Sequence, residues 1–129
     1  MFTPLDIFSG FSVTDIAAAK AFYGDTLGLA VTEGPMGNLD LALPGGSHVF
    51  IYPKPDHEPA TFTILNLVVD DIDAAVADLN AAGVETNIYD SPDLPTDDKG
   101  VLRGKQANMG PDIAWFRDPA GNVLSVLQD

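Results

Sequence analysis

The stretch AWFRDPAGNVLSVL, residues 114–127, decides the fold of this chain. Two apolar runs flank a turn in which Pro119 presets the backbone angle φ and Gly121 can adopt a positive φ. The side chains of Asp118 and Asn122 can bond nearby backbone groups, as turn residues commonly do. The stretch therefore predicts a β-hairpin. A shorter copy of the pattern, LPGGSHVFIY at residues 43–52, predicts a second hairpin in the first half of the chain.

Each hairpin belongs to a half with the same order of predicted elements. The dipeptide Asp15-Ile16 begins one predicted helix and Asp71-Ile72 begins the other, and Gly28 and Gly83 end them. In the first half we expect strands at 7–13, 29–33, 39–43 and 48–52. In the second half we expect strands at 61–69, 84–89, 113–117 and 123–127, and 101–107 is a further candidate. This internal repeat predicts two similar modules.

The length and composition predict a single domain built from these modules. The chain has 129 residues and 46% hydrophobic content, enough for one core. Three prolines between residues 53 and 59 cannot continue a sheet, so they mark a linker. We therefore expect one domain over 1–129, with module 1 at about 1–53, the linker at 53–60 and module 2 at about 61–129.

The charge and the absence of cysteine exclude several partners and chemistries. With 6 basic and 19 acidic residues, the net charge of -13 argues against nucleic acid and against an anionic membrane surface. No cysteine is present for a disulfide, a thiolate ligand or a thiol nucleophile. The first residues lack the pattern of a signal peptide, and no apolar run has membrane-spanning length. We therefore expect a cytoplasmic protein with a neutral or cationic small-molecule ligand.

Period-two alternation separates the two faces of the predicted strands. One face is aliphatic and is expected to lie against helices: Phe11, Val13, Val49, Ile51, Leu65, Leu67, Val69, Leu124 and Val126. The opposite face mixes polar and aromatic groups, as ligand-binding surfaces do: Phe8, Gly10, Ser12, His48, Phe50, Tyr52, Ile64, Asn66, Val68, Val123, Ser125 and Leu127. Trp115 is expected on this second face, opposite Ser125.

The repeated motifs resemble those of the vicinal oxygen chelate superfamily, which includes glyoxalase I, extradiol dioxygenases, fosfomycin-modifying enzymes and bleomycin-resistance proteins. The resemblance covers nearly the whole chain and is carried by VTDI at 13–16, FY at 22–23, LGL at 27–29, VDDIDAA at 69–75 and FRDPAGN at 116–122. It implies an α+β fold of two tandem βαβββ modules that form a curved mixed sheet around a cleft. It also implies a homodimer.

The resemblance further implies where a metal ion would bind. In metal-using members, His, Gln or Glu occupies one inward position on each of four strands, and these positions correspond here to Phe8, Phe50, Ile64 and Ser125. Two aromatic rings, an aliphatic chain and one hydroxyl cannot replace the hydration shell of a divalent cation. We therefore expect no metal and no other cofactor. Of the two histidines, we expect His48 to line the cleft or to lie at its edge, and His57 to be solvated.

These observations lead to one preferred function and two alternatives. The preferred hypothesis is metal-independent, bleomycin-resistance-like sequestration of a small aromatic molecule, neutral or cationic. The alternatives are a glyoxalase-like lyase or dioxygenase of the same superfamily, and a scaffold without a ligand. The segment 90–111 is a candidate lid from which Arg103 either binds an anionic group or pairs with surface acids. The expected ligand-binding residues are Phe8, Ser12, His48, Phe50, Tyr52, Ile64, Asn66, Arg103, Trp115 and Ser125.

Overall fold

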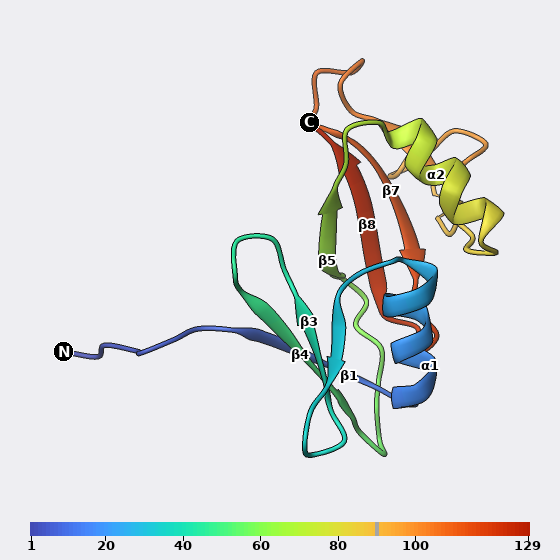
Figure 1. Cartoon of the computed structure of the whole chain (residues 1–129). Coiled ribbons are helices and arrows are strands. Elements are labelled where there is room, and N and C mark those ends of the chain that lie inside the picture. The colour runs from blue at the N-terminus through green and yellow to red at the C-terminus, as the bar shows by residue number, and fades with distance from the viewer. Residues whose placement is uncertain (90) are drawn as a thin grey trace. The chain divides into compact units, whose positions relative to one another are not determined.

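The computed structural model describes residues 1–89 and 91–129 and divides the chain into two compact units, Met1–Pro59 and Ala60–Asp129. The unit boundary falls inside the Pro-rich segment expected as a linker. Each unit has a four-stranded mixed sheet and a helical segment (Figure 1). In the described residues no helix is both long and apolar enough to cross a membrane.

The first unit contains four strands and one helical segment. Strand β1 (Ser9–Val13) is followed by α1 (Ile16–Lys20), which continues as a π-helical segment, η1 (Ala21–Thr26). Strands β2 (Val31–Glu33), β3 (Leu39–Ala42) and β4 (His48–Pro53) complete the unit. The sheet order is β1-β4-β3-β2, with β1 parallel to β4 and the other pairs antiparallel.

The second unit repeats this order. It comprises β5 (Thr63–Val68), α2 (Ile72–Ala81), β6 (Val101–Arg103), β7 (Asp112–Arg117) and β8 (Val123–Gln128). Its sheet order is β5-β8-β7-β6, again with one parallel pair, β5 with β8. Helix α2 packs on β7 and β8, as Figure 1 shows. The internal repeat inferred from the sequence is therefore confirmed at the level of topology.

Local side-chain chemistry explains why the helices and the C-terminal hairpin begin and end where they do. The Asp15 carboxylate accepts hydrogen bonds from the amides of Ala17 and Ala18, and Asp71 caps α2 in the same way through the Ala74 amide. In the β7–β8 turn, the Asp118 carboxylate accepts from the amides of Ala120 and Asn122, each at 2.9 Å. The helix caps and the hairpin predicted from the sequence are confirmed.

The core of each unit contains part of the face predicted from the alternation, whereas Phe11, Leu65, Leu67 and Val69 of that face are only half-buried. Val13, Val49 and Ile51 are buried in the first unit, where the Tyr23 ring lies 5.7 Å from that of Phe11. Leu124 and Val126 are buried in the second. The opposite face is less uniformly open than expected, because Val123 and Ser125 are buried as well.

One predicted strand is wrong, and five are shorter than predicted, those at 7–13, 29–33, 39–43, 61–69 and 101–107. Residues 84–89 form no strand; Asn87 makes an isolated bridge to Trp115, and the Thr86 hydroxyl donates to the Lys99 carbonyl at 2.7 Å. The candidate strand at 101–107 ends at Arg103, because the chain turns at Gly104. The first strand begins at Ser9 rather than residue 7, so Phe8 precedes β1. Figure 1 shows the residues before β1 extending away from their sheet.

Candidate functional site

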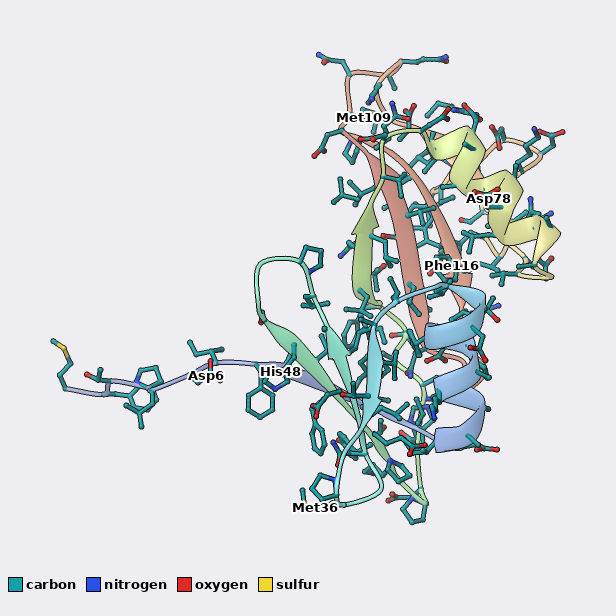
Figure 2. All side chains as sticks on the ribbon, viewed as in Figure 1. Asp6, Met36, His48, Asp78, Met109 and Phe116 are labelled. Carbon is teal, nitrogen blue, oxygen red and sulfur yellow. The ribbon has the colours of Figure 1, made fainter. Side chains whose placement is uncertain are left out.

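The first unit presents a partly exposed row of rings, here called the aromatic strip: Phe8, His48, Phe50 and Tyr52. The last three alternate along one face of β4, and Figure 2 marks His48 at the beginning of that strand. The Phe8 ring stacks on the His48 ring with centroids 4.8 Å apart, and the Phe50 and Tyr52 rings lie 5.7 Å apart. Phe8 is 55% exposed and Tyr52 is 37% exposed. The strip therefore offers π-faces to a ligand rather than filling the core.

Tyr52 of the aromatic strip also lines a polar pocket of about 370 Å³. The other lining residues are Ser12, Lys54, Asp56 and Glu58. Ser12 and Tyr52 are neighbours across the β1–β4 ladder. The Lys54 ammonium donates to the Asp56 carboxylate at 2.8 Å. This hydrogen bond raises the pKa of Lys54 and lowers the pKa of Asp56, so both groups are charged at neutral pH.

His57 is not the solvated linker residue that we expected. Its ring is half-buried, and its Nδ1 atom lies 2.6 Å from the Ser12 hydroxyl oxygen. The turn after β4 explains the placement: the His57 amide donates to the Lys54 carbonyl at 3.0 Å, and the Lys54 amide donates to the Val13 carbonyl. The turn therefore folds the imidazole back onto β1, so the sequence prediction for His57 is corrected.

The second unit brings together three of the predicted site residues. Asn66, Ser125 and Trp115 occupy adjacent register positions across β5, β8 and β7. The fully buried Ser125 hydroxyl donates to the Asn66 side-chain oxygen at 2.6 Å. The Trp115 indole N–H donates to the Thr63 hydroxyl at 3.2 Å. The hydrogen-bonding atoms of Trp115 and Ser125 are thus already engaged by neighbours on the same sheet.

Ile64 and Tyr89 differ from the sequence reading of this face. Ile64 sits at a register irregularity in β5, between Thr63 and Leu65, which strict alternation does not anticipate. The ring of Tyr89, in the segment expected to be a strand, lies 5.2 Å from that of Trp115 in an edge-to-face arrangement. Tyr89 was not among the predicted site residues. Its aromatic side chain was the only feature of the sequence that could have indicated it.

Arg103, also in the second unit, lies in a cluster of carboxylates. Its guanidinium donates to Asp73 at 2.6 and 3.2 Å and to Asp97 at 3.2 and 3.3 Å, and Asp112 lies at 3.9 Å. The hydrogen bond to Asp73 raises the pKa of Arg103 further above its already high value. The geometry matches the alternative of pairing with nearby acids; a role in ligand binding stays a prediction.

The four positions at which related proteins hold a metal do not fit a divalent ion here. The side chains of Phe8, Phe50 and Ile64 have no metal-binding atom, and the Ser125 hydroxyl alone is a single neutral ligand. Over residues 1–89 and 91–129, no group of three or more histidine, aspartate or glutamate side chains is placed to hold an ion. The assignment of all ten predicted residues to one ligand site stays a prediction, as does the lid. Asp90, where the predicted lid begins, lies outside the described residues.

Comparison with known proteins places these features in a wider context. The model of the Glyoxalase/Bleomycin resistance protein/Dioxygenase superfamily matches residues 8–126. Among solved structures, the antibiotic binding protein TnmS3 from Streptomyces sp. CB03234 is 26% identical, with a TM-score of 0.64 and 98% of each chain covered. No curated protein sequence matches the chain.

Two more distant structures show the fold alone. A putative glyoxalase family protein from Bacillus anthracis is 20% identical, with a TM-score of 0.68, and the match covers 100% of this chain and 99% of the other. The fosfomycin resistance protein FosX from Listeria monocytogenes is 14% identical, with a TM-score of 0.69 and coverage of 100% and 95%. The predicted α+β fold of two tandem modules is therefore confirmed.

Proposed function

The chain belongs to the glyoxalase/bleomycin resistance protein/dioxygenase superfamily, and from this premise we propose that it binds a small aromatic molecule, neutral or cationic, without a metal. The observation that carries the proposal is the aromatic strip of Phe8, His48, Phe50 and Tyr52, with its rings partly exposed. Stacking on such rings holds flat ligands, and the faces of Phe and Tyr rings also attract cations.

Charge supports the cationic form of the ligand. The net charge of -13 attracts cations from solution, and Asp56 and Glu58 line the pocket that adjoins Tyr52. The likeness to TnmS3, described as an antibiotic binding protein, also supports sequestration of a small molecule. The positions that hold metal in related proteins carry Phe8, Phe50, Ile64 and Ser125, which supports recognition by stacking and shape.

A matched set of ligands tests this proposal by isothermal titration calorimetry. Three compounds share a bicyclic aromatic core and carry an ammonium, a hydroxyl or a carboxylate group. We expect the affinity to follow that order, and the advantage of the ammonium compound to shrink as salt is raised. If none of the three binds at millimolar concentration, or if the carboxylate compound binds most tightly, the proposal is wrong.

Substitutions in the aromatic strip locate the binding site. Phe50→Ala removes a central ring, and stacking of about 1–2 kcal/mol predicts a loss of affinity of about 5- to 30-fold. Phe62→Ala is the matched control, because Phe62 is an exposed phenylalanine outside both sheets. Equal losses in the two variants would exclude the strip as the site.

The proposal includes a cytoplasmic homodimer in which each chain is one domain of two modules. Both the homodimer and the pairing of modules around a cleft follow from the family resemblance. Light scattering after size-exclusion chromatography measures the mass directly: a mass near twice 13.6 kDa supports the dimer, and 13.6 kDa contradicts it.

Elemental analysis of untagged protein separates the binding function from a metal-dependent lyase or dioxygenase, since stoichiometric zinc, manganese, nickel or iron would favour the enzyme.

A further inference from the structure

The Ser12–His57 pair has the geometry of a nucleophile beside its base. The Ser12 hydroxyl oxygen and His57 Nδ1 are 2.6 Å apart, within the range over which a histidine can take a proton from a serine. Ser12 also lines the open pocket of about 370 Å³ next to β1 and β4, so a small substrate can approach its oxygen. A buried structural serine would lack this access.

Backbone structure holds both partners in place. Ser12 is within β1 and paired in register with Tyr52 of β4. His57 closes a turn through its amide hydrogen bond to the Lys54 carbonyl, and its ring is half-buried. A base whose backbone is held by a turn and whose residue is partly buried loses less conformational freedom during proton transfer than a fully exposed one. The pair is therefore arranged before any substrate binds.

The same pocket contains one cation, Lys54, and the phenol of Tyr52 beside the carboxylates of Asp56 and Glu58. Lys54 and Tyr52 line the pocket, and an ammonium or a phenol hydroxyl is the kind of donor that stabilises the oxygen of a reacting carbonyl group. The Lys54 ammonium also forms a 2.8 Å ion pair with the exposed Asp56 carboxylate. Ser12 and the cationic Lys54 thus share one pocket, and His57, which is not part of its lining, contacts the Ser12 hydroxyl at 2.6 Å.

We propose that Ser12 is a nucleophile, activated by His57, that hydrolyses small carboxylic esters. His57 Nδ1 accepts the Ser12 proton while the serine oxygen bonds to the ester carbonyl carbon. The ester C–O bond then breaks, and the proton passes from Nδ1 to the leaving alcohol. Water, deprotonated by His57, then attacks the acyl carbon; the bond from that carbon to the Ser12 oxygen breaks, His57 returns the proton to Ser12, and the acid leaves, so that ester and water become acid and alcohol. This activity does not depend on a ligand at the aromatic strip.

Covalent labelling of the full chain with a fluorophosphonate tests the proposal. The serine oxygen displaces fluoride from phosphorus, and intact-mass and peptide-mapping mass spectrometry locate the adduct. We expect one adduct at Ser12 and none at Ser125, whose hydroxyl lies at the same 2.6 Å from an acceptor that is an amide oxygen and not a base. A folded wild-type protein that gains no adduct at Ser12 would overturn the proposal.

Variants separate a nucleophile from an ordinary surface serine. Ser12→Ala should abolish both labelling and the release of p-nitrophenol from p-nitrophenyl acetate above the buffer rate. His57→Gln should slow labelling of Ser12 at least 100-fold. Ser47→Ala, at an exposed serine in the β3–β4 turn, should leave labelling unchanged. Circular dichroism confirms that each variant folds. Equal labelling of Ser12 in His57→Gln, or ester turnover that persists in Ser12→Ala, would show that the pair is only structural.

Discussion

Gly100 and Gly83 form a natural pair for measuring how tightly the loop before β6 packs against the segment that follows α2. Both glycines have a positive φ, 87° and 86° respectively. A Cβ atom at Gly83 would meet nothing within 4 Å, whereas one at Gly100 would lie 2.2 Å from the Thr86 carbonyl oxygen and 2.7 Å from Asn87 Cα. Substitution by alanine at each site therefore imposes the same backbone strain, and a collision with backbone at Gly100 alone.

The structure sets the size of the two effects. Left-handed backbone costs an L-residue about 1–2 kcal/mol, and we expect Gly83→Ala to lose about that much stability. Gly100→Ala must also move the chain at Thr86 by about 1 Å. This shift disrupts the 2.7 Å hydrogen bond from the Thr86 hydroxyl to the Lys99 carbonyl and loosens the buried Val101. We expect a total loss of about 3–5 kcal/mol for Gly100→Ala.

Urea denaturation followed by circular dichroism measures both losses. With a typical slope, the extra loss in Gly100→Ala corresponds to a midpoint about 1–2 M lower than that of Gly83→Ala. The slope itself should match in the two variants, which shows that they unfold to similar ensembles. If the two losses of stability agree within about 0.5 kcal/mol, Gly100 does not lie close to Thr86. The packing of the loop before β6 against the segment after α2 would then be wrong as well.

Two further predictions concern the carboxylate cluster around Arg103. Burial raises the pKa of Asp97, but hydrogen bonds from the Val101 and Lys99 amides and from Arg103 outweigh it and lower the pKa overall. Asp97 therefore stabilises the fold above its ordinary pKa near 4, and the stability is lost as pH falls through the lowered value. The urea-midpoint gap between wild type and Asp97→Asn should shrink from pH 7 to pH 3; an unchanged gap would contradict this. Lysine cannot make the forked contacts that the Arg103 guanidinium makes with Asp73 and Asp97. In Arg103→Lys, trypsin should therefore cleave after Lys99 about three- to tenfold faster, whereas Arg117→Lys should not change that rate.

Patterns within about ten residues of each other were enough to predict the topology. The capping carboxylates of Asp15 and Asp71, the positive-φ glycines at 28 and 83, and the Asp118–Asn122 turn all act on their own neighbours. Because these signals occur twice in the same order, the second sheet could be expected to repeat the first. The resemblance to the superfamily rests on these same residues.

Residues 84–89 show where this reasoning fails. Their composition favours a strand, but their partners are set by a loop more than ten residues away. The Thr86 hydroxyl bonds to the Lys99 carbonyl, and Gly100 lies directly against the Thr86 backbone. Tertiary contacts of this kind override the local propensity for β structure. Nothing within the segment itself distinguishes it from a true strand.

The duplicated backbone also explains why the candidate chemistry is found in one module and not the other. The register pair Ser12–Tyr52 across β1 and β4 corresponds, by topology, to Val68–Leu127 across β5 and β8. Val68 has no hydroxyl to serve as a nucleophile, and Leu127 has neither the aromatic ring nor the hydroxyl of Tyr52.

The next pair along the same strands diverges in the opposite sense. Gly10–Phe50 in the first unit corresponds to Asn66–Ser125 in the second, where the two polar side chains satisfy each other at 2.6 Å. In the first unit, this face of the sheet is aromatic, and the strand β4 leads into the turn that carries His57. In the second unit, the Asn66–Ser125 hydrogen bond engages the polar groups of the equivalent face. Since both sheets keep the same strand order, the fold requires only the buried aliphatic positions, and the opposite face is free to acquire a different function in each half.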